Sequence, residues 1–355
     1  MDQIISRSKT YFNDVYKISS NGVLSNLDNK VVMVTGAYGL IGSFIIDVLM
    51  TRTLELNGNI TVIAFGRNEQ RMTKRFSSYI NSPNFKYICQ DVNIPICYKW
   101  KIDYIMHLAS NAHPWSFKSD PVGTITANIF GLKNILDYAK DNNVTKVLYT
   151  SSGEVYGEAD SLIKEFKEDF NGYVNPTSSR SCYPNSKRCA ETLCVSYAEQ
   201  YWVDTVITRP SHTYGPNMTE NDTRVYAEFL RNIIEGKDII LKSEGKQIRS
   251  YTYIADCVEA FFYVLLKGKN KNAYNVANPN SITSIKNMAE VIAKIGGSKV
   301  IMDIPKGNVI SNPMQCGVLN TDKLLSLGFI PKYDLEVGYT HCINILKEIN
   351  SKKLI

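Results

Sequence analysis

A short apolar strand that runs directly into a glycine-rich turn and a helix constrains this chain most. The strand is the run Val31–Val34, and the turn is the heptapeptide GAYGLIG at 36–42. After the turn, apolar residues recur at helical spacing from Phe44 to Leu49, and a second apolar strand follows at 60–65. This strand–helix–strand unit predicts a parallel sheet covered by helices.

The glycines of the turn suit a dinucleotide. Gly36 permits the tight turn, Gly39 lets a pyrophosphate approach the backbone, and Gly42 allows close packing of the helix. The helix N-terminus adds a favourable partial positive charge. A glycine-rich turn alone is also compatible with an ordinary connection, but its place between a buried strand and a helix predicts a dinucleotide site that includes Leu40 and Ile41.

The same alternation continues along the chain and sets the expected organisation. Further strands are expected at 86–88, 104–108, 146–150 and 205–208, with helices at 122–141 and 183–201. We therefore predict an α/β fold, a doubly wound parallel sheet of the Rossmann type, over residues 30–209. A smaller C-terminal region over 210–355, with helices at 224–235, 256–266 and 284–295, is expected to bind mainly substrate. Residues 1–29 form an N-terminal extension to which the sequence assigns no role.

Composition narrows the class of protein. The 40 basic and 34 acidic residues are spread along the chain, so no nucleic-acid partner is indicated, although the net charge of +6 suits an anionic substrate. Eight cysteines without a C-x-x-C pair and only four histidines suggest neither a disulfide framework nor a metal site. Because the apolar runs are strand- or helix-sized and no signal-peptide core precedes them, we expect a soluble, cytoplasmic protein without membrane contact.

Two further motifs carry candidate catalytic residues. Tyr183 and Lys187 lie one helical turn apart, and a nearby ammonium favours the phenolate, so Tyr183 can act as a base. Spacing alone would equally fit a partly buried tyrosine beside an exposed lysine, but the position of the pair after the glycine turn favours catalysis. After the strand at 146–150, Ser152 can bond a substrate oxygen. Glu154 is either an additional acid or base or a solvated loop carboxylate.

In their order along the chain, these motifs resemble the sugar-nucleotide epimerase, dehydratase and decarboxylase group of extended short-chain dehydrogenases/reductases. The resemblance covers about residues 30 to 340. The motifs that carry it are Gly36-x-x-Gly39-x-x-Gly42, Asp91-Val92, His107-Leu108-Ala109-Ser110, Asn128, Ser152-x-Glu154-Val155-Tyr156-Gly157, Tyr183-x-x-x-Lys187 and Arg209-Pro210-x-x-x-Tyr214-Gly215-Pro216. The segments 174–176, 180–183, 187–192 and 221–225 are most similar to UDP-glucuronate decarboxylases.

The resemblance implies a nicotinamide cofactor and transient oxidation of the sugar at C4. Tyr183 would remove the proton of the C4 hydroxyl, and Lys187 would hold the nicotinamide ribose. The other implied cofactor contacts are Asp91, Val92, Leu108, Ala109, Ser110 and Asn128. The implied substrate contacts are Ser152, Tyr183, His212, Asn217, Arg224 and Arg249, of which Arg249 would neutralise the diphosphate. A homodimer built on the helices at 122–141 and 183–201 is also implied.

The choice between NAD and NADP depends on the end of the second strand. An acid there usually bonds the ribose hydroxyls of NAD, but this chain reads Ala64-Phe65-Gly66-Arg67-Asn68. Arg67 could accept a 2′-phosphate or lie over the adenine. We expect NAD, with NADP as the alternative.

Three departures from the family leave the reaction open. Gly153 stands where 4,6-dehydratases carry an aspartate, Asn217 where decarboxylases carry an arginine, and His212 where asparagine is usual. We expect decarboxylase-like modification of a nucleoside-diphosphate sugar through a 4-keto intermediate, with a 4-epimerase as the first alternative and a 4,6-dehydratase or C4 dehydrogenase after it. A non-catalytic dinucleotide-binding protein is the alternative from another class, against which the presence of Tyr183, Lys187 and Ser152 argues.

Overall fold

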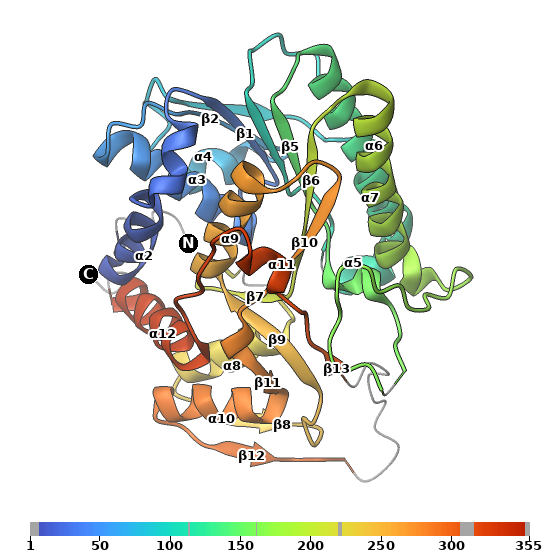
Figure 1. Ribbon diagram of the computed structural model, residues 1–355. Helices are drawn as coiled ribbons and strands as arrows, with labels where there is room; N and C mark the ends of the chain where they lie inside the picture. Colours follow the sequence, from blue (N-terminus) through green and yellow to red (C-terminus); the bar gives the residue numbers. More distant parts are fainter. Residues whose placement is uncertain (1–6, 113, 161, 219–221, 306–315, 352–355) are drawn as a thin grey trace.

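The computed structural model describes residues 7–112, 114–160, 162–218, 222–305 and 316–351. Its centre is a parallel sheet of seven strands in the order β10-β6-β5-β4-β1-β2-β3 (Figure 1). The strands are β1 (Val31–Thr35), β2 (Thr61–Gly66), β3 (Phe85–Cys89), β4 (Tyr104–His107), β5 (Lys146–Thr150), β6 (Thr205–Pro210) and β10 (Asn272–Val276). Strand order reverses between β1 and β4, which confirms the predicted doubly wound α/β fold and marks the crevice where such sheets bind ligands.

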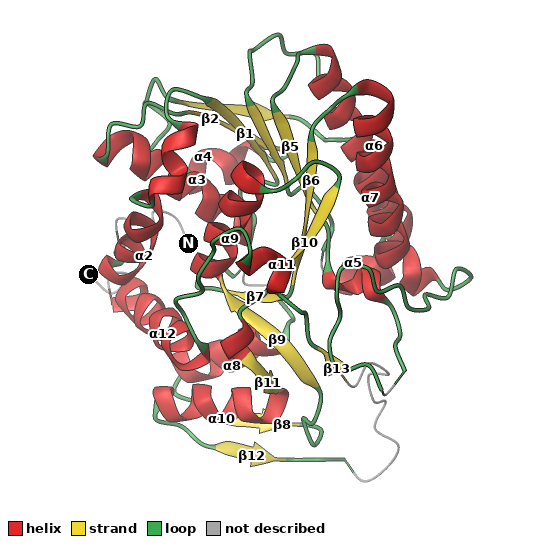
Figure 2. Ribbon diagram, in the orientation of Figure 1, coloured by secondary structure: helices red, strands yellow, loops and turns green. Residues whose placement is uncertain are grey.

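Helices cover both faces of this sheet (Figure 2). On one face, Val32 and Val34 of β1 pack in the core that includes α3 (Leu40–Glu55) and α9 (Ile254–Lys267). On the other face, Met33 packs in the core of α6 (Pro121–Asp141) and α7 (Cys182–Tyr201). Because both of their faces are buried, the central strands β1 and β2 are continuous apolar runs rather than alternating ones.

The smaller region is built around β9 (Ile248–Tyr253). Its partners are β7 (His212–Tyr214), β11 (Ile282–Ser284) and β13 (Cys316–Gly317), while β8 (Ile239–Leu241) pairs with β12 (Val300–Met302). Three helices pack together over these strands: α8 (Val225–Ile234), α10 (Ile285–Gly296) and α12 (Leu335–Ser351). Apart from the N-terminal helix α2, which is described below, the remaining elements are α4 (Glu69–Arg75), α5 (Pro114–Ser119), α11 (Asp322–Leu325), η1 (Gly22–Leu27), η2 (Gly153–Tyr156), η3 (Ser179–Ser181) and η4 (Pro279–Ser281).

The domain boundary predicted after residue 209 stays a prediction. The structure shows that two elements from beyond this residue pack with the first part of the chain. Both β10 and α9 come from beyond that boundary, yet β10 is the edge strand of the large sheet and α9 covers it. Among the helices that the structure describes, none combines the length and apolarity needed to cross a lipid bilayer.

The N-terminal extension contains a helix, α2 (Lys9–Ser19), that packs against α3 and α12. The Tyr11 hydroxyl donates to Asp47 of α3 at 2.6 Å. The buried carboxylate of Asp14 accepts hydrogen bonds from the hydroxyls of Tyr253 at 2.7 Å and Tyr333 at 2.9 Å. The extension therefore connects the helix that follows the glycine turn to the central strand of the smaller region.

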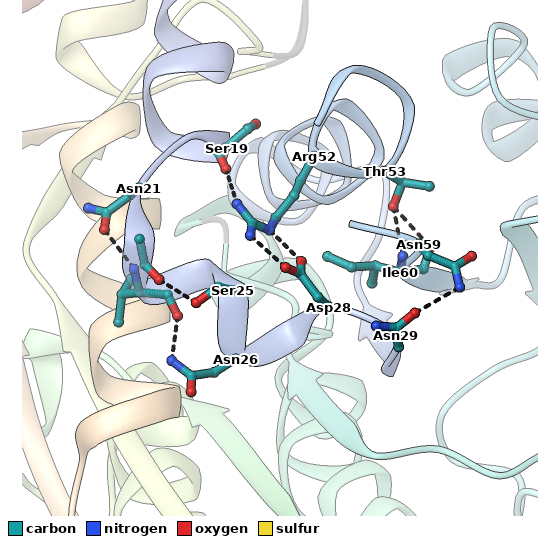
Figure 3. A network of polar contacts seen from close by, with 12 residues as sticks. Ser19, Asn21, Ser25, Asn26, Asp28, Asn29, Arg52, Thr53, Asn59 and Ile60 are labelled. Carbon is teal, nitrogen blue, oxygen red and sulfur yellow. Dashed lines mark hydrogen bonds and ion pairs between the residues drawn. The ribbon is translucent and has the colours of Figure 1, made fainter. Parts of the chain in front are cut away.

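Arg52 anchors the end of this extension (Figure 3). Its Nε and Nη2 donate to the two carboxylate oxygens of Asp28 at 2.6 and 2.8 Å, and Nη1 donates to the carbonyl of Ser19 at 2.8 Å. Only 10% of the Arg52 side chain is exposed. All three bonds are charge-assisted, the bond to Ser19 is buried and the two bonds to Asp28 are partly buried, which makes them stronger than a fully exposed ion pair.

We predict that Arg52→Ala lowers the free energy of unfolding by about 2 kcal/mol, because it removes these bonds and leaves Asp28 unpaired. Urea unfolding followed by circular dichroism measures this change. The control is Lys133→Ala, which breaks the exposed pair with Asp137 and should cost no more than about 0.5 kcal/mol. Equal effects of the two substitutions would contradict the anchoring role.

Candidate active site

The glycine turn lies between β1 and α3, as predicted, and the surrounding backbone leaves no room for a side chain at Gly36 or Gly42. Gly36 has φ +66°, and a Cβ there would lie 2.9 Å from the carbonyl carbon of Leu108. A Cβ on Gly42 would lie 2.4 Å from the carbonyl oxygen of Gly36. No side chain caps α3 at Gly39, so the first amides of the helix, at Leu40 and Ile41 among others, can bind an anion.

The carboxyl end of β4 is fixed beside this turn by Thr35. The Thr35 hydroxyl accepts hydrogen bonds from the amides of Leu108 and Ala109, both at 3.1 Å, and lies 2.8 Å from Nδ1 of His107. His107 is buried, and this burial, together with the charge of Lys187, lowers its pKa to about 3. The imidazole is therefore neutral and acts as part of the framework.

Several buried polar atoms at this edge of the sheet have no partner within the described chain. They are Nε2 of His107, the hydroxyl of Tyr149, and the hydroxyls of Thr150 and Ser151. Buried polar groups are normally hydrogen-bonded, so this group of atoms suits a polar ligand. Together with the tight glycine turn and the uncapped helix, these atoms fit a dinucleotide, whose pyrophosphate the first amides of α3 would bind.

A chain of hydrogen bonds links the predicted cofactor residues to α7, the helix that carries Tyr183 and Lys187. Ser110 donates to Oδ1 of Asn128 at 2.7 Å, and Nδ2 of Asn128 donates to the hydroxyl of Ser186 at 2.9 Å. Next along α7, Lys187 is buried and its Nζ donates to the carbonyl of Thr150 at 2.7 Å. Burial lowers the pKa of Lys187 to about 7. The amine is thus poised between its two protonation states near neutral pH.

Tyr183 lies one turn before Lys187 on α7, and the structure brings the two together. The Lys187 Nζ is 5.6 Å from the centre of the Tyr183 ring, which stacks on Phe117 with ring centres 4.5 Å apart. Burial raises the pKa of Tyr183 and Glu154 raises it further, while a hydrogen bond with Ser152 lowers it. Positive charge close to the ring, from the Lys187 ammonium or from a bound ligand, favours its ionisation.

Glu154 lies at the edge of this group and is held by an arginine. Nη2 of Arg180 lies 3.1 and 3.0 Å from the two oxygens of Glu154, and the guanidinium lies 4.8 Å from the centre of the Phe117 ring. Sequence reasoning assigned no role to Arg180 or Phe117. Arg180 stood within the decarboxylase-like segment and could have been singled out, whereas Phe117 lies on the short helix α5, which no pattern indicated.

The smaller region contributes cationic residues. Arg224 pairs with Asp222, its Nη1 donates to the carbonyl of Thr213 at 3.4 Å, and its charge lowers the pKa of Tyr183. Arg249 is buried on β9. His212 lies on β7 opposite Tyr251 of β9. The charge of Arg249 lowers the pKa of His212, so these predicted substrate residues lie near one another.

Asn217 makes a different set of contacts. Its Nδ2 donates to the hydroxyls of Tyr11 at 3.0 Å and Ser43 at 3.1 Å, which belong to α2 and α3. Its role in substrate binding stays a prediction. The described contacts of its amide nitrogen join the N-terminal extension to the cofactor helix.

The predicted adenine-side residues follow β2 and β3. Nη1 of Arg67 lies 3.9 Å from Oδ2 of Asp91, and 64% of the Arg67 side chain is exposed. Val92 packs against α6, where a Cβ on Gly131 would lie 2.8 Å from its Cγ2. Since β2 and β3 are neighbours in the sheet, these residues lie along one edge, on the side of β1 away from β4.

Comparison with known proteins adds independent findings. The family described as "NAD dependent epimerase/dehydratase family" matches residues 32–277. UDP-glucuronic acid decarboxylase 5 of Arabidopsis thaliana is 33% identical over 313 residues, which cover 87% of both chains. UDP-glucuronic acid decarboxylase 6 of the same plant is 35% identical over 310 residues, again 87% of both chains.

Solved structures confirm the fold. The UDP-glucose 4-epimerase of Thermotoga maritima, solved with UDP-glucose, superposes with a TM-score of 0.75 at 22% identity and covers 92% of this chain and 100% of that one. The dTDP-glucose 4,6-dehydratase of Bacillus anthracis, solved with NAD, gives a TM-score of 0.74 at 20% identity with the same coverage.

We predict that Gly42→Ala weakens NAD binding by about tenfold or more, which corresponds to at least about 1.4 kcal/mol. The added methyl group would collide with the Gly36 carbonyl and displace α3 from the pyrophosphate site. Titration calorimetry with NAD measures the change. Gly22→Ala is the control, because a Cβ there meets nothing within 4 Å. Unchanged NAD affinity in Gly42→Ala would contradict this assignment of the turn.

Proposed function

This chain belongs to the NAD dependent epimerase/dehydratase family, and from that membership we propose that it decarboxylates a nucleoside-diphosphate sugar acid, with UDP-glucuronate as the first candidate. The observation that carries the proposal is the grouping of Tyr183, Lys187 and Ser152 with Glu154, which Arg180 holds in place. Relatives with 33–35% identity that are named UDP-glucuronic acid decarboxylases support it.

When bound, NAD would supply a hydride acceptor and a positive charge. In the proposed reaction, Tyr183 would accept the proton of the C4 hydroxyl as the sugar is oxidised to a ketone at C4. Lys187, in its ammonium form, stabilises the phenolate of Tyr183. Ser152 donates a hydrogen bond to the C4 oxygen. These three side chains hold the reacting oxygen and move its proton.

The ketone makes the loss of carbon dioxide possible. With a carboxylate at C6, the oxidised sugar is a β-keto acid, and the electrons of the C5–C6 bond flow into the ketone as carbon dioxide leaves. Protonation at C5 restores the ketone, and Tyr183 would return its proton to the C4 oxygen as the ketone is reduced to the hydroxyl again. Glu154 is the group that we propose to orient water or deliver the proton at C5.

Two features of the chain separate this proposal from its alternatives. An epimerase needs only Tyr183 and Ser152, so a positioned Glu154 favours chemistry beyond epimerisation. A Cβ on Gly153 would make only ordinary contacts, the nearest at 3.7 Å. Packing therefore does not force a glycine there, and the missing side chain counts against a 4,6-dehydratase, which needs an acid at that position.

The test incubates the purified protein with NAD and UDP-glucuronate and follows product mass and reduced-nicotinamide absorbance. We expect loss of one carbon dioxide per sugar without accumulation of reduced cofactor. Unchanged mass with a new stereoisomer would replace the proposal by a 4-epimerase. Reduced cofactor that accumulates in proportion to product would indicate a C4 dehydrogenase.

Tyr183→Phe is the matched control. It removes only the hydroxyl, so we expect turnover to fall by about 10²–10⁴-fold while NAD affinity stays within error of the parent. A fully active variant would exclude Tyr183 as the base.

We further propose a homodimer that works in the cytoplasm, where reducing conditions keep cysteines as thiols. Large apolar side chains on α6 are exposed, with Val122 at 69% and Phe130 at 56%. Trp202, just after α7, is 89% exposed. Burial of such a surface against a second copy is favourable.

Sedimentation velocity should show a dimer at micromolar concentration, and Phe130→Glu should shift it to monomer. A parent protein that sediments only as a monomer would refute the dimer.

A further inference from the structure

An imidazole lies close to two guanidinium groups in the smaller region. His212 of β7 is directly opposite Tyr251 of β9, and the centres of the two rings are 5.7 Å apart. Arg249 precedes Tyr251 by two residues, so both side chains project from the same face of β9. Arg249 is buried, whereas His212 is exposed. The imidazole therefore faces solvent beside a fixed positive charge.

The second guanidinium comes from the segment before α8. Arg224 donates to the carbonyl of Thr213, the residue after His212, and its other nitrogens pair with Asp222. Beside His212 the structure places Arg249 and Tyr251 from β9 and Arg224 with Asp222 from this segment. The two guanidinium groups lower the pKa of His212, so they disfavour a further positive charge there.

These surroundings keep His212 neutral in the ligand-free protein. Surrounding protein lowers its pKa the most, and the charges of Arg249 and Arg224 lower it further, to about 4. The side chain is open to solvent, so the effect of burial is partial until a ligand fills the site, whereas the two arginines act in either state. The surrounding protein and the two arginines therefore both favour a neutral imidazole at pH 7.

We propose that His212 is a contact for the substrate diphosphate that takes up a proton when this group binds. This inference rests on the proposed function, because it requires a nucleoside-diphosphate sugar as ligand. The two negative charges of the diphosphate neutralise Arg249 and Arg224 and lie close to the imidazole. The same charge that binds to the arginines then stabilises imidazolium, which adds a third charged contact.

The sign of the pH dependence follows directly. The group is neutral in the free protein and has a higher pKa in the complex, so binding consumes a proton at any pH between these two values. Affinity for the diphosphate is highest at low pH and falls as the pH rises through the pKa of the complex. For one proton the slope is at most about tenfold per pH unit. An asparagine at this position would give no such dependence.

The experiment titrates the NAD-loaded Tyr183→Phe protein with UDP-glucose in a calorimeter. The Tyr183→Phe background prevents turnover, and the diphosphate diester has no proton to lose between pH 6 and 8. Titrations at pH 6.5 in two buffers of different ionisation enthalpy give the number of protons taken up. We expect an affinity that rises several-fold from pH 8 to 6, with net proton uptake that the additional substitution His212→Asn abolishes.

Two controls make the result specific. Lys187, with a pKa of about 7, also titrates in this range and can contribute to proton uptake. The decisive quantity is therefore the difference in the number of protons taken up between His212→Asn and its parent. His341→Gln, which changes a histidine on α12 that contacts Asp14, should leave proton uptake unchanged. Binding of UDP-glucose with the same pH dependence in His212→Asn and its parent would overturn the inference alone. Absence of UDP-glucose binding at every pH would overturn the proposed function, and the inference with it.

Discussion

The contact between α3 and the carbonyl of Gly36 is the constraint on which the site depends. A hydrogen atom is all that fits on Gly42 at this contact, and the carbonyl region of Leu108 crowds Gly36 from the other side. Helix α3 therefore begins against the carboxyl ends of β1 and β4, where strand order reverses. The amides of the helix, the Thr35 hydroxyl and the residues after β4 are all oriented by this one close approach.

The elements that the sequence predicted well are those buried on both faces. Strands β1, β2 and β5 form unbroken apolar runs because α3 and α9 cover one face of the sheet and α6 and α7 the other. Strand β10 lacked this signal. Its sequence, NAYNV, carries the buried Asn275, whose side chain bonds Tyr156 and the carbonyls of Phe166 and Asn320. The hydrogen-bond partners of this buried amide lie more than 40 residues away in sequence, so no local sequence pattern could reveal them.

Contacts of the N-terminal extension near the site were likewise not predictable from local sequence patterns. Asn217 stands where related decarboxylases carry an arginine. Its amide nitrogen donates to the hydroxyls of Tyr11 and Ser43. Tyr11 belongs to a segment outside the family's matched range of 32–277, so family motifs could not place it. The described contacts of Asn217 thus join the extension to α3, and its role in substrate binding stays a prediction.

The ionisable groups of the candidate site share one property. Burial raises the pKa of Tyr183 and lowers that of Lys187, and the surrounding protein together with Arg249 and Arg224 lowers that of His212, so in each case the protein alone disfavours the charged form. The permanent positive charges nearby are those of Arg180, Arg224 and Arg249, of which the first two pair with Glu154 and Asp222. Added positive charge favours a phenolate at Tyr183, and added negative charge favours an imidazolium at His212. A positively charged nicotinamide and an anionic diphosphate have these signs, which agrees with the proposed function.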